Sequence, residues 1–142
     1  MKVTTAETLE RAALIPVLRA RNAGQAHAVV QAMLAGGIRV VEVTMTVPGA
    51  VELLRELKSE YGNELLLGSG TVTTGGQAED TIEAGAEFVV SPSFHADVVA
   101  ATKAHGKLSI PGALTPTEVI TAAARVYLEI ITRFRNSEQR PK

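Results

Sequence analysis

Five short apolar runs, each rich in Val, Ile or Leu, alternate along this chain with longer segments of helical periodicity. The runs cover residues 14–18, 38–44, 64–67, 87–90 and 107–110. Because they are apolar almost throughout, they are typical of strands buried on both faces, as in a parallel sheet covered by helices. Right-handed crossovers make successive parallel strands neighbours. The sequence therefore predicts an α/β fold of repeated strand–helix units.

The segments between the runs predict helices. Asn22 is a favourable N-cap for one whose apolar residues recur at three- and four-residue steps. Thr115 and Glu118 form a capping box with Pro116 at the first helical position, so a last helix is predicted to run to about Arg135. The other predicted helices cover residues 5–12, 51–57, 77–84 and 96–104.

The length limits how much of a barrel these units can form. The chain has 142 residues, whereas a complete (β/α)₈ barrel needs roughly 200 or more. We therefore expect an incomplete parallel TIM-barrel type of fold, with about five βα units ending in a long helix. Residues 1–135 are the expected domain, and residues 136–142 are an expected polar tail.

Composition excludes several classes of function. The formal net charge is −1, without the basic face that nucleic-acid binders show. There are no cysteines, and no apolar run approaches the roughly 18 residues of a membrane span. His27, His95 and His105 lack metal-ligand spacing on one face. We expect no metal, no nucleic-acid or membrane partner, and a cytoplasmic location.

Candidate chemistry lies where the predicted strands end, because ligands of parallel barrels bind at the carboxyl ends of the strands. Glycine and hydroxyl residues gather there beside one carboxylate and one guanidinium, which fits a small anionic substrate. Gly68 and Gly70 are expected to leave backbone amides open to an anion. The strand ends carry Arg19, Glu42, Thr44, Thr46, residues 68–71, residues 91–93, Pro111 and Gly112.

Glu42 is the leading catalytic candidate because it interrupts an apolar strand. Burial of a carboxylate raises its pKa and suits it to proton transfer near neutrality. The alternative is a structural carboxylate paired with Arg19 or Arg39. Arg19 could hold a substrate carboxylate as a two-pronged donor, or it could be a surface residue. Thr73 stands where a dinucleotide-binding fingerprint needs its third glycine, which argues against that cofactor.

Four ordered stretches resemble the 2-keto-3-deoxy-6-phosphogluconate (KDPG) and 4-hydroxy-2-oxoglutarate (KHG) aldolase family, over about residues 8–122. In chain order they are Val40-Val41-Glu42-Val43-Thr44, Gly68-Ser69-Gly70-Thr71-Val72, Phe88-Val89-Val90-Ser91-Pro92, and Ile110-Pro111-Gly112 with Thr115-Pro116-Thr117-Glu118.

The resemblance implies a class I aldolase, a lyase that cleaves its substrate to pyruvate and an aldehyde through a lysine Schiff base, without a metal or cofactor. It implies that Glu42 is the general acid/base and that Thr71 holds the pyruvate carboxylate. Thr46 stands where the family often has an arginine, so carboxylate binding would shift to Arg19 and Thr71. Pro92 would pack beside the bound keto acid.

The resemblance also implies a departure. The family's Schiff-base lysine follows the helix that begins at Thr115, but this sequence leaves the family pattern after Ala122. We therefore expect impaired aldol cleavage. The alternative is a non-catalytic half-barrel, a structural or oligomerising module with residual anion binding; a phosphate-handling epimerase fits the motifs less well. An unclosed barrel predicts a homo-oligomer, or an open flavodoxin-like sheet covered by the last helix.

Overall fold

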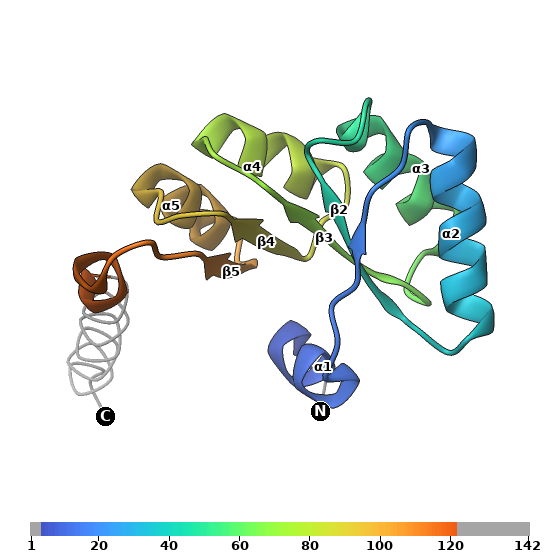
Figure 1. The fold of residues 1–142 in the computed structure, drawn as a ribbon, viewed down its shortest axis with the longest axis horizontal. Helices are drawn as coiled ribbons and strands as arrows, with labels where there is room; N and C mark the ends of the chain where they lie inside the picture. Colours follow the sequence, from blue (N-terminus) through green and yellow to red (C-terminus); the bar gives the residue numbers. More distant parts are fainter. Residues whose placement is uncertain (1–3, 122–142) are drawn as a thin grey trace, which may run out of the picture. The chain divides into compact units, whose positions relative to one another are not determined.

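Strands and helices alternate through the first of the two units into which the chain divides, Met1–Gly112. The computed structural model describes residues 4–121. Figure 1 shows the elements in chain order. They are α1 (Thr5–Ala12), β1 (Val17–Leu18), α2 (Ala23–Ala35), β2 (Val40–Thr44), α3 (Ala50–Tyr61), β3 (Leu66–Gly70), α4 (Gly75–Glu83), β4 (Phe88–Ser91), α5 (Ala96–Ala104) and β5 (Leu108–Pro111).

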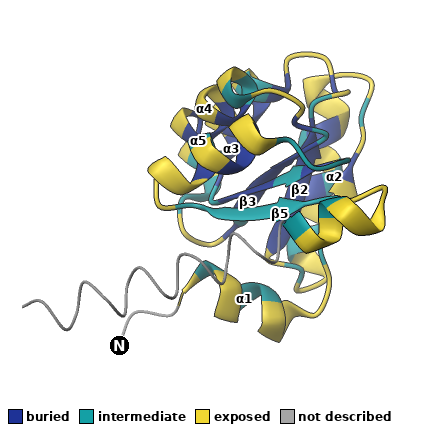
Figure 2. Cartoon of the chain, turned by 90° about the vertical axis from the view of Figure 1, so that its left-hand side faces the viewer, coloured by how far each residue is buried: buried dark blue, intermediate teal, exposed yellow. Residues whose placement is uncertain are grey.

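The sheet of this unit has five parallel strands in the order β1-β2-β3-β4-β5. A flavodoxin-like sheet has the order 2-1-3-4-5 and helices on both faces. Here the order is sequential, and α2–α5 lie on one face of the sheet (Figures 1 and 2). The predicted partial (β/α)-barrel type of fold is confirmed, and the flavodoxin-like alternative is wrong.

The apolar core lies between the sheet and the helices, where Figure 2 shows the buried residues. Val41 and Val43 of β2 belong to it, and so do Leu53, Leu54 and Leu57 of α3. Because side chains alternate along a strand, Glu42 and Thr44 must point to the opposite face. We call this face, away from α2–α5, the inner face of the sheet.

The two glycines of β3 lie inside the strand, which corrects a prediction. The apolar pattern placed the end of this strand at residue 67, but it continues to Gly70 and pairs with β2. The amides of Gly68 and Gly70 therefore do not form an open anion-binding loop. Their lack of a side chain has another cause, because a Cβ atom at Gly68 would overlap the buried ring of Phe88.

The described part of the second unit, residues 113–121, contains the predicted capping box. The Thr115 hydroxyl accepts from the Glu118 amide at 3.2 Å, and the Glu118 carboxylate accepts from the Thr115 amide at 3.3 Å. Residues 116–121 are helical. The predicted continuation to Arg135 and the polar tail lie outside the described residues, so the boundaries of the domain stay a prediction.

Candidate active site

Glu42 lies in β2, which is paired with β1 on one side and β3 on the other, and its side chain is on the inner face with only 8% of its surface exposed. The position of the Glu42 side chain requires a glycine at position 70 of the neighbouring strand β3, because a Cβ atom at Gly70 would overlap the Glu42 carboxylate. Val17 of β1 and Gly68 of β3 stand beside Glu42 in the register of the sheet. The fold therefore holds one carboxylate in a largely apolar layer.

Burial raises the pKa of Glu42 above its ordinary value of 4.5, and the nearby charge of Arg19 opposes part of this rise. Arg19 follows β1 and is exposed. Within residues 4–121, no cation reaches ion-pair distance of Glu42. Arg39 precedes β2, at the other end of the strand. The alternative of a structural ion pair with Arg19 or Arg39 is therefore not realised.

The raised pKa of Glu42 makes stability depend on pH. The native state keeps this proton at pH values where the unfolded chain has released it, so the free energy of unfolding falls as pH rises above about 4.5. Glu42→Gln removes this dependence. We expect the variant to gain stability over the natural chain between pH 4 and pH 7, measured by urea unfolding. A stability difference that stays constant over this range would contradict a raised pKa for the buried Glu42 carboxyl.

Three threonine hydroxyls meet at the carboxyl ends of β2 and β3. The Thr44 hydroxyl oxygen lies 2.7 Å from that of Thr71 and 3.3 Å from that of Thr46. Thr44 is fully buried, whereas Thr46 is exposed and Thr71 is half-buried. Thr71 has a φ of 60°, a left-handed conformation that is rare for a β-branched residue and concentrates at functional sites.

The sequence placed Thr44 at the end of its strand but assigned substrate binding only to Thr46 and Thr71, whose hydroxyls Thr44 joins. Its position two residues after Glu42 was the available signal, since residues i and i+2 of a strand share a face. Pro92 follows β4 and is exposed, two strands away from Glu42. A Cβ atom at Gly112 would overlap the Pro92 carbonyl oxygen, so that glycine lets the ends of β4 and β5 meet closely.

The described lysines lie away from this site. Lys107 precedes β5 and pairs with Glu87 at 2.8 Å, at the amino ends of the strands. Lys58 and Lys103 belong to the last turns of α3 and α5, which lead back to the same end. Within residues 4–121, no group of three or more His, Asp or Glu side chains is placed to hold a metal ion.

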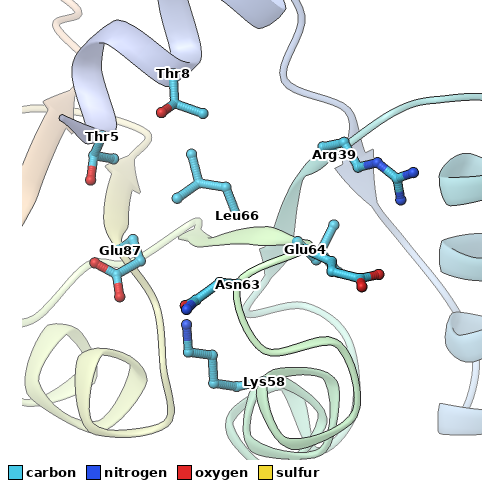
Figure 3. Close-up of a pocket in the computed structure, with 9 residues that line it drawn as sticks. Thr5, Thr8, Arg39, Lys58, Asn63, Glu64, Leu66 and Glu87 are labelled. Atoms are coloured by element: carbon cyan, nitrogen blue, oxygen red, sulfur yellow. The ribbon is translucent and has the colours of Figure 1, made fainter. Parts of the chain in front are cut away.

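The amino ends of the strands contain a cavity of about 300 Å³, shown in Figure 3. Thr5 and Thr8 of α1 face it from one side, while Leu66 and Glu87 face it from the sheet. In barrels this end serves stability and not catalysis.

None of the helices that the structure describes is both long and apolar enough to span a membrane.

Comparison with known proteins agrees with this geometry. The family model described as KDPG and KHG aldolase matches residues 5–134, so the match runs beyond the residue 122 expected from the motifs. A 2-dehydro-3-deoxy-phosphogluconate aldolase of Treponema pallidum is 41% identical over 117 residues, which are 82% of this chain and 55% of that protein. The chain thus spans about half the length of the curated relatives it matches.

Solved structures give the same result. KDPG aldolase from Legionella pneumophila, crystallised with pyruvate captured as a covalent carbinolamine, is 34% identical with a TM-score of 0.72, over 78% of this chain and 53% of that chain. Dihydropteroate synthase of Yersinia pestis, 16% identical with a TM-score of 0.61 over 84% of this chain and 49% of that chain, shows only the shared fold.

Five sequential parallel βα units form part of a (β/α)-barrel. Their buried carboxylate lies toward the carboxyl ends of the strands, where barrel enzymes carry their active sites. Within that class the chain belongs to the KDPG and KHG aldolase family. Its named relatives are aldolases, which are lyases.

Proposed function

We propose that this chain carries the proton-transferring and carboxylate-binding part of a class I aldolase site for KDPG or KHG. The observation that supports it best is Glu42, a carboxylate buried on the inner face with a raised pKa. Thr71 and Thr46 lie at the carboxyl end of the same pair of strands, with Arg19 beyond β1. In this proposal, Thr71, Thr46 and Arg19 bind the carboxylate of a pyruvate-type keto acid, and Pro92 borders it.

The chemistry requires one group that both gives and takes protons. An amine adds to the keto carbon to form a carbinolamine, whose hydroxyl leaves as water once it is protonated. The resulting iminium acidifies the adjacent carbon, and a base removes a proton there to give the enamine. A carboxyl group with a raised pKa is better suited to both steps than an ordinary one, because its pKa lies closer to the pH at which it must both give and take a proton. Glu42 is proposed for both.

The amine is the part that the described residues do not supply at this site. Lys58, Lys103 and Lys107 belong to the opposite end of the sheet. We therefore propose that the chain as given depends on an external amine for this chemistry and cleaves aldol substrates poorly alone. Borohydride reduction with pyruvate, followed by intact mass, checks this, since a reduced adduct would show that one of its lysines does form the Schiff base.

Chemical rescue by methylamine tests the function itself. Methylamine forms the iminium with pyruvate. Glu42 then removes a methyl proton to give the enamine, and a deuteron derived from D₂O is added back at the same carbon. We expect the chain to accelerate this amine-dependent exchange about 10-fold or more over methylamine alone, because general acid–base catalysis contributes 10²–10⁴-fold in an intact site. Proton NMR of the pyruvate methyl group measures it. Exchange equal to that with methylamine alone would contradict the proposal.

A second candidate function is a non-catalytic oligomerising half-barrel. Strand β1 is at the edge of the sheet, with Val17 47% exposed on its inner face and Leu14 56% exposed before it. Exposed apolar groups on an edge strand favour self-association. Sedimentation would show a homo-oligomer under either function. Self-association without any amine-dependent exchange would favour the non-catalytic one.

A further inference from the structure

Among the described side chains of this site, the buried hydroxyl of Thr44 is a polar group for which the aldolase chemistry gives no direct task. It is fully buried at the end of β2, and it stands beside Gly70 in the register of the sheet. Its closest polar partner is the Thr71 hydroxyl at 2.7 Å, an O–H···O distance typical of a well-formed hydrogen bond. Thr46, at 3.3 Å, is a weaker second partner.

The backbone around Thr71 is fixed on both sides. The Met45 amide donates to the Gly70 carbonyl at 2.8 Å, and the Val72 amide donates to the Val90 carbonyl at 3.2 Å. Between these two bonds Thr71 takes its left-handed conformation. Such a conformation persists only where the surroundings determine it. With the backbone held in this way, the question that remains is in which direction the Thr71 hydroxyl proton points.

We propose that Thr44 is a positioning residue that donates its hydroxyl proton to Thr71 and thereby turns the Thr71 proton outward, toward a bound carboxylate. This inference rests on the proposed keto-acid site. A hydroxyl carries one proton and two lone pairs. If Thr71 donates its proton to an anion, its close contact with Thr44 is favourable only when Thr44 is the donor. Linked hydrogen bonds polarise one another, so Thr71 becomes the stronger donor.

The test is a double-mutant cycle on Thr44 and Thr71, with pyruvate as the probe and the amide shifts of Thr71 and Val72 as the readout. Thr44→Val keeps the volume and removes the hydroxyl. We expect it to raise the Kd for pyruvate about 3- to 10-fold, the range of one net hydrogen bond. Thr44→Ser should restore binding to within about 2-fold. Thr44→Val should add nothing in the Thr71→Val background, because residues acting as one unit are not additive.

Thr81→Val is the matched control. The Thr81 hydroxyl is also fully buried, and it lies 2.9 Å from that of Ser69 in β3, on the helix side of the sheet. Its loss should lower stability without changing the Kd. The inference is overturned if Thr44→Val leaves the Kd unchanged, or if its effect multiplies with that of Thr71→Val. If pyruvate does not bind, or if Thr71→Val binds it as tightly as the natural chain does, the proposed function fails as well.

Discussion

Glu42→Gln is expected to abolish the amine-dependent proton exchange of pyruvate. The amide has nearly the shape of the carboxyl group but neither takes nor releases a proton near neutrality. Exchange should therefore fall to the rate with methylamine alone, a loss of the whole acceleration of about 10-fold or more that the natural chain gives. The buried position supports a clean comparison, because a neutral amide costs less to bury than a carboxylate. The effect is measured as the rate of pyruvate proton exchange at fixed concentrations of methylamine and pyruvate. Extrapolation to zero protein gives the background rate with methylamine alone.

Glu79→Gln provides the control for this experiment. Glu79 is an exposed carboxylate on α4, on the helix side of the sheet. The Glu79→Gln variant should exchange the pyruvate methyl protons at the same rate as the natural chain. If Glu42→Gln also exchanges at the natural rate, Glu42 is not the base, and the assignment of the site to the inner face at β2 is wrong.

Gly70→Ala is expected to have the second large effect, and to act on both stability and chemistry. The added Cβ atom would overlap the carboxylate and the stem of Glu42. Either Glu42 swings out of its place or β2 and β3 move apart, and overpacking of this kind costs about 1–3 kcal/mol. We expect a lower midpoint of urea unfolding together with a loss of exchange comparable to that of Glu42→Gln.

Gly76→Ala is the matched substitution. Gly76 lies in α4, where a Cβ atom would meet nothing within 4 Å. Alanine in a helix is about 0.5–1 kcal/mol better than glycine, so this variant should be equal to or more stable than the natural chain and should exchange normally. A Gly70→Ala variant that behaves like Gly76→Ala would show that the Glu42 side chain does not occupy the space beside β3.

Local patterns were sufficient for the elements themselves. The helix Thr5–Ala12 has the predicted bounds, and the four central helices each follow a strand, as expected. The capping box at Thr115 formed as predicted. These features depend on neighbours within a few residues, such as caps, apolar periodicity and proline placement, so the sequence states them directly.

The extent of β3 could not be predicted in the same way. A glycine has no side chain to show an apolar pattern, and Gly-x-Gly after an apolar run is usually a turn. Gly68 and Gly70 belong to the strand because Phe88 and Glu42 occupy the space that side chains would fill. Those partners come from other strands, so nothing near the glycines in the sequence indicates them.

The sequence by itself determined the order of strands and helices, the family, and the one carboxylate that interrupts an apolar strand. Only the tertiary structure decided which residues surround that carboxylate. The Thr44 and Thr71 hydroxyls that meet at 2.7 Å are 27 residues apart in the chain. Parallel register brings them together, and register depends on the packing of whole strands against helices, which no local pattern encodes.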